Sequence, residues 1–170
     1  MADIRREVGF WSSLRAMGIV SILWPEGIWA VVIGGGGATL FGQYSSIQDR
    51  VDVASDYLAI VAPLLGITVA ALALVITVTI TRYGSILSET ERGIVGFTSP
   101  FVVAIGAQAV TLLMAIAYRA LALELGGRVE CLFFLIVSIL SVFVLLDVVA
   151  LARNLVMHGR AIARYAQDDS

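Results

Sequence analysis

Four consecutive glycines, Gly34–Gly37, lie inside an apolar stretch that runs from Val31 to Gly42. In water, each glycine costs a helix about 1 kcal/mol relative to alanine, so this stretch makes a poor soluble helix. In a bilayer the backbone has no water to bond, which enforces the helix, and glycine then lets a second helix approach closely. The run therefore predicts a membrane helix that either packs tightly on a neighbouring helix or is broken at the glycines.

The composition places the whole chain in a membrane. Hydrophobic residues make up 59% of its 170 residues and charged residues only 14%, against about 25% charged residues in a soluble domain. This length is enough for about four spanning helices with short connections. No room remains for a separate soluble catalytic or sensor domain, and the net charge of −2 indicates no particular partner.

The hydropathy pattern predicts an all-α, polytopic membrane protein with four transmembrane helices. Residues 1–24 are expected to form an amphipathic interfacial helix, with a frayed extension of the first span as the alternative. Residues 25–152 form the transmembrane domain, with spans at about 27–47, 57–83, 100–122 and 129–152. A polar loop is expected at 48–56, and Ser99 and Pro100 supply the start of the third span. Residues 153–170 form a basic cytoplasmic helical extension of the last span and a tail.

The distribution of arginines predicts the orientation. With the N-terminus in the cytoplasm, eight arginines lie on the cytoplasmic side and three on the other. Because cytoplasmic flanks carry the excess of positive residues, both termini are expected in the cytoplasm. The expected location is the bacterial inner membrane.

Small residues at steps of four predict the helix-packing faces. Gly34, Ala38 and Gly42 form such a ladder on the first span, and Gly66 and Ala70 lie on a similar stripe of the second. These faces are expected to pack against each other within one subunit, or between subunits. The alternative for the glycine run is a broken, pore-lining helix with exposed carbonyl groups.

The most informative charge is Asp147, which lies well inside the fourth span. A carboxylate at the centre of a bilayer costs about 2.5–3.5 kcal/mol on insertion scales, so it must face protein or water. At 100° per residue, Asn154 and His158 share its face, and Gln108 lies on a polar face of the third span. These residues are candidates for a pore or vestibule lining. The alternative is a single structural bond from Asp147 to Arg82 or to the backbone.

A second stripe on the last helix is basic and consists of Arg153, Arg160 and Arg164. Arginines just cytoplasmic of a span usually meet anionic lipid headgroups, so membrane lipids are the favoured partner. A nucleic acid or nucleotide is the less favoured ligand, because three arginines without interleaved aromatic residues are few for such a site.

No enzymatic constellation is present in the sequence. The Gly34–Gly37 run follows no strand and lacks the Lys-Ser/Thr pair of a phosphate-binding loop. His158 is the only histidine and Cys131 the only cysteine, and they are far apart in sequence, so no metal site or cofactor is expected. The protein is therefore expected not to be an enzyme.

These features favour a homo-oligomeric channel or pore-like effector, because a lone unit of four helices has little interior for a transport path. Perturbing the membrane in bacterial defence would be one use of such a protein. The alternative is a non-catalytic subunit that anchors or scaffolds a larger membrane complex through an unidentified protein partner.

Overall fold

A computed structural model describes the backbone of residues 26–80 and 93–168, and the side chains of residues 26–77 and 98–157. Every element in these ranges is helical, so the all-α class is confirmed. The elements are α4 (Glu26–Ala30), η1 (Val31–Gly35), α5 (Gly36–Tyr44), α6 (Ile47–Ile80), α8 (Gly93–Leu121) and α9 (Gly127–Asp168). The expected interfacial helix at 1–24 lies outside the described residues.

Three of these helices are long and apolar enough to cross a membrane. They are Ile47–Thr77, Thr98–Leu121 and Gly127–Met157. The first predicted span, at about 27–47, corresponds to α4, η1 and α5, which together form one helical rod of about 28 Å at 1.5 Å per residue. That length is close to the thickness of the hydrocarbon core, about 30 Å, and the fourth crossing stays a prediction.

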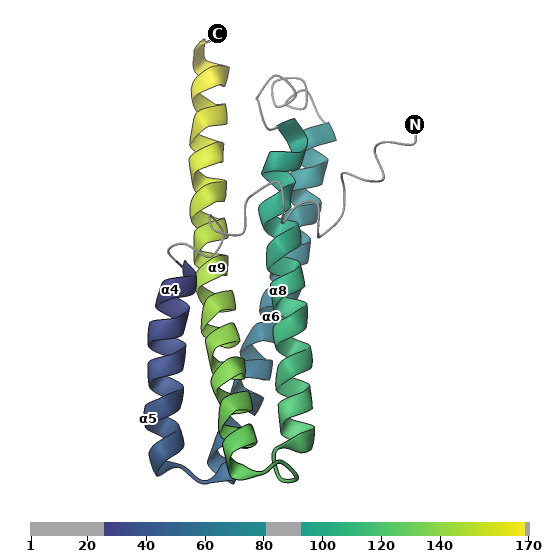
Figure 1. The fold of residues 1–170 in the computed structure, drawn as a ribbon. Helices are drawn as coiled ribbons and strands as arrows, with labels where there is room; N and C mark the ends of the chain where they lie inside the picture. Colours follow the sequence, from purple (N-terminus) through teal and green to yellow (C-terminus); the bar gives the residue numbers. More distant parts are fainter. Residues whose placement is uncertain (1–25, 81–92, 169–170) are drawn as a thin grey trace.

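The helices run alternately up and down, with α4, η1 and α5 on one side of α9 and with α6 and α8 on the other (Figure 1). The two described turns, Ser45–Ser46 and Ala122–Gly126, lie at the same end of the bundle, which we call the turn end. Helix α9 has 42 residues and continues well past the start of α4. At about 63 Å it is about twice as long as a membrane crossing requires.

The expected polar loop at 48–56 is wrong, because these residues form the first turns of α6. Ser46 and Asp49 cap this helix reciprocally. The Ser46 backbone N–H donates to Asp49 Oδ2 over 2.8 Å, and the Asp49 N–H donates to Ser46 Oγ over 3.2 Å. This S-x-x-D capping box satisfies N–H groups of the first turn, so the helix begins at Ile47.

The third helix also begins earlier than predicted. Helix α8 starts at Gly93, so Pro100 lies inside it rather than at its first turn. The Ser99 side chain, expected to cap the helix, is buried with no hydrogen-bond partner among the described residues. Proline inside a membrane helix is tolerated because neighbouring groups can compensate for the lost N–H bond.

The interior is built on a seven-residue repeat, which we call the heptad seam. Helices α6 and α9 each contribute one series of residues at steps of seven: Ala54, Val61, Thr68 and Val75 on α6, and Glu130, Val137, Val144 and Leu151 on α9. Helix α8 contributes two such series, which are Phe101, Gln108 and Ala115, and Ala104, Thr111 and Tyr118. All of these side chains are buried. A period of seven keeps one face of each helix against its neighbour, as in left-handed helix packing. The long helices therefore fill their own interior with side chains.

The glycine run is neither broken nor a plain α-helix. Val31–Gly35 form a single π-helical turn between α4 and α5, and this turn packs on α9. A methyl group added at Gly34 would lie 2.8 Å from Ile139 Cα and 2.9 Å from the Ser138 carbonyl oxygen. Only glycine fits this contact, because both neighbours are backbone atoms that cannot rotate away.

Candidate functional site

Asp147 lies on α9 within the segment Gly127–Met157, and its side chain is half-buried. Glu26, at the start of α4, lines the same groove as Leu146, the residue before Asp147 on α9. Asp147 has no hydrogen bond or ion pair to any other described residue. Arg82, the structural partner that we considered for Asp147, lies outside the described residues. Unlike the buried Glu130 of the same helix, which has an ion-pair partner, this half-buried carboxylate has none among the described residues.

This groove, of about 330 Å³, opens between α4 and α9. Its polar lining consists of Glu26, Arg153 and Asn154, and its apolar lining includes Trp29 and Val149. The structure therefore brings Asn154 and Arg153 to the same end of the bundle as Asp147. The side chains of His158, Arg160 and Arg164 lie outside the described residues, although their backbone continues α9.

Gln108 does not lie with these residues. Its side chain is completely buried on the heptad seam, and its amide nitrogen donates to Thr68 Oγ1 on α6 over 2.9 Å. The structure thus places Gln108 between two helices rather than on a surface that could line a vestibule. A buried amide in an apolar bundle is held there by its bond across the helices.

The residues expected at helix-packing positions divide into two groups. Gly34 and Ala38 are buried, and the η1 turn and α5 pack on α9. Gly66 and Ala70 are exposed on α6, and nothing lies within 4 Å of a methyl group placed at Gly66 or Gly42. The partner of the glycine run within the subunit is therefore α9, and not the Gly66–Ala70 stripe that we expected. Contact of that stripe with a second subunit stays a prediction.

A buried cluster that the sequence does not predict lies at the turn end and consists of Arg50, Tyr118 and Glu130. Arg50 forms a bidentate ion pair with Glu130, with Nε to Oε1 at 3.0 Å and Nη2 to Oε2 at 2.7 Å. The Tyr118 hydroxyl donates to the same carboxylate. All three side chains are buried. The cluster joins α6, α8 and α9, and we call it the charged latch.

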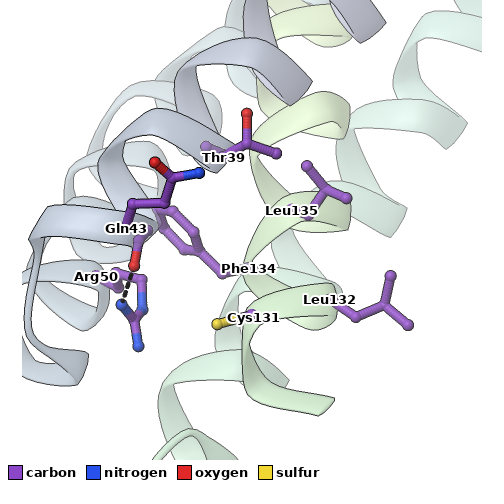
Figure 2. A pocket seen from close by; sticks show the side chains of 9 residues that line it. Thr39, Gln43, Arg50, Cys131, Leu132, Phe134 and Leu135 are labelled. Carbon is purple, nitrogen blue, oxygen red and sulfur yellow. Dashed lines mark hydrogen bonds between the residues drawn. The ribbon is translucent and has the colours of Figure 1, made fainter. Parts of the chain in front are cut away.

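The Arg50 side chain of the charged latch also caps the C-terminal end of α5. Arg50 Nη1 donates to the carbonyl oxygens of Gly42 at 3.2 Å and Ser45 at 2.8 Å. The last carbonyl groups of a helix lack partners of their own, so a buried guanidinium here satisfies two of them. Figure 2 shows the pocket of about 310 Å³ between α5 and α9 beside the latch, with Arg50 and Cys131 in its lining. The Cys131 thiol lies 3.6 Å from Glu130 Oε2.

The signal that locates the latch in the sequence is the period of seven. Counting back from Val144 and Val137 leads to Glu130, and counting forward from Ala104 and Thr111 leads to Tyr118. A glutamate and a tyrosine at the ends of heptad faces made otherwise of small and apolar residues indicate a buried polar contact there.

Among the described residues, no group of three or more histidine, cysteine, aspartate or glutamate side chains is placed to hold a metal ion. Comparison of the chain with protein-family models, curated proteins and solved structures finds no match.

Proposed function

We propose that this chain is a subunit of a homo-oligomeric channel or pore-like effector of the bacterial inner membrane, with both termini in the cytoplasm. The observation that carries the proposal is Asp147, a half-buried carboxylate within the apolar segment Gly127–Met157. An ionisable residue within a spanning segment is a candidate for an ion pathway, with a single structural bond as the alternative. Acting on the membrane in defence is one use of such a pore.

The path must lie between subunits in this proposal. The heptad seam fills the interior of a single subunit with side chains from α6, α8 and α9. Helix α6 is the least covered of the long helices, with 17% of its most apolar window buried. Its exposed small residues, Gly66 and Ala70, would let a second subunit approach its backbone.

Conductance tests the role of Asp147. Purified protein in planar bilayers is expected to conduct cations, and Asp147→Asn is expected to lower the cation conductance roughly tenfold, which corresponds to about 1.4 kcal/mol of lost attraction. The matched control is Asp52→Asn, an exposed carboxylate of α6 near the turn end, which should leave the current unchanged. Equal currents from wild-type protein and Asp147→Asn would remove Asp147 from the pathway.

Native mass spectrometry in detergent tests the assembly. We expect a closed oligomer, and Gly66→Leu should weaken subunit association about tenfold, because a large side chain blocks close backbone approach. Gly37→Leu is the control, since Gly37 is also exposed with nothing within 4 Å of an added methyl group. A strict monomer would contradict the channel.

The second candidate is a non-catalytic anchoring or scaffold subunit of a larger membrane complex. The solid heptad seam favours it, because a subunit without an internal path is sufficient for anchoring. A monomer without conductance that recovers a partner from its native membrane would support this candidate against the first.

A further inference from the structure

The groove between α4 and α9 carries one charge of each sign. Glu26 lies in the first turn of α4, and Arg153 lies in the C-terminal half of α9. These two side chains form no ion pair with each other, although both line the same groove of about 330 Å³. Because the two opposite charges line one groove without pairing, a ligand that carries one charge of each sign can pair with both of them.

The surroundings of the groove are apolar and open outward. Trp29 is 56% exposed, Val149 66% and Met157 49%, and all three line it. In a helix that crosses a membrane, large exposed apolar side chains face lipid chains. The groove lies beside the start of α4, at the end of the α4–α5 rod away from the two turns, while α6, α8 and α9 continue farther (Figure 1). Because this rod of about 28 Å nearly matches the hydrocarbon core, its start is the level at which we expect lipid headgroups.

We propose that this groove binds a phospholipid whose zwitterionic headgroup carries a primary ammonium beside its phosphate. The phosphate pairs with Arg153, whose guanidinium can donate two parallel hydrogen bonds to it. The ammonium donates to the Glu26 carboxylate. One acyl chain lies along the apolar floor formed by Val149 and Leu146. This lipid site is additional to the proposed channel, although it lies next to Asp147 and shares Glu26 and Asn154 with its surroundings.

The charges of the groove select this headgroup over the two common alternatives. A glycerol headgroup with a net negative charge offers a phosphate to Arg153 but no positive charge to Glu26, so its hydroxyl groups can donate only uncharged hydrogen bonds to that carboxylate. A quaternary ammonium has no N–H to donate, so it can stack on Trp29 but cannot bond to the Glu26 carboxylate. Of the three headgroups, the primary ammonium alone offers Glu26 both a positive charge and N–H donors.

Native mass spectrometry of the delipidated full-length protein can measure this preference. The probes are phosphatidylethanolamine, phosphatidylcholine and phosphatidylglycerol with identical acyl chains, added one at a time. We expect the ethanolamine lipid to bind roughly five-fold more tightly than the other two, as expected for one exposed ion pair. Glu26→Gln should abolish this preference and leave weak binding of all three lipids. Arg153→Gln should weaken the binding of all three.

The controls are Glu124→Gln and Arg128→Gln, which alter exposed charges at the turn end. Both should keep the wild-type lipid preference. Equal binding of the three lipids by wild-type protein would overturn the proposal, and so would an ethanolamine preference that survives in Glu26→Gln. Because lipid binding is measured without any current, it can fail while the channel stands, and the channel can fail while the lipid site stands.

Discussion

Replacing Glu130 by alanine is expected to lower the free energy of unfolding by about 3–5 kcal/mol, because it leaves the buried Arg50 guanidinium without its counter-charge. Arg50 and Glu130 are 6% and 0% exposed, so water cannot replace the lost carboxylate. The Tyr118 hydroxyl loses its acceptor in the same variant. Reversible unfolding of the protein in mixed detergent micelles or bicelles measures the change.

Two further variants separate the charge from the packing. The double variant Arg50→Met/Glu130→Met removes both charges and should recover part of the lost stability, since apolar residues of similar volume can replace a buried ion pair. Glu124→Ala removes an exposed acid of the neighbouring turn and should change stability by no more than about 0.5 kcal/mol. If Glu130→Ala unfolds like wild-type protein, the charged latch does not hold the turn end together.

The charged latch also illustrates which features of this protein can be predicted from its sequence and which cannot. Composition and hydropathy predict the all-α class, which the structure confirms, and apolar helices long enough to span a membrane, of which the described residues contain three. They do not reveal that Arg50 is buried, because an arginine between three aspartates reads as a solvated loop. Its burial depends on the ion pair with Glu130, 80 residues away in sequence. It also depends on the Ser46–Asp49 capping box, which starts α6 within the expected loop.

The same limit applies to the glycine run and to Gln108. Steps of four along one helix indicate a face on which a backbone can come close, but they do not identify the helix that comes close. The structure supplies that helix, α9, through the contact of Gly34 with Ile139. Likewise, Gln108 on a polar face is compatible with a pore lining or with a buried bond, and its bond to Thr68 depends on the register of α6 against α8.

The second large effect is expected at Gly34. Gly34→Ala should destabilise the protein by about 1–3 kcal/mol, the usual cost of overpacking an interior contact. The added methyl group would lie 2.8 Å from Ile139 Cα, so α9 and the η1 turn would have to move apart. Unfolding in the same detergent or bicelle system measures this loss, and disulfide crosslinking between cysteines placed on η1 and α9 should slow as the helices separate.

Gly36→Ala is the matched control, two residues along the same rod. Nothing lies within 4 Å of a methyl group at Gly36, so the substitution adds no clash. It should leave stability unchanged or raise it by up to about 1 kcal/mol, because alanine restricts the unfolded chain and favours the helix. If Gly34→Ala lowers the free energy of unfolding and Gly36→Ala raises it, α9 approaches the run closely at Gly34 and not along all four glycines. Equal effects would contradict the close approach of α9, since helix propensity alone acts similarly on both positions.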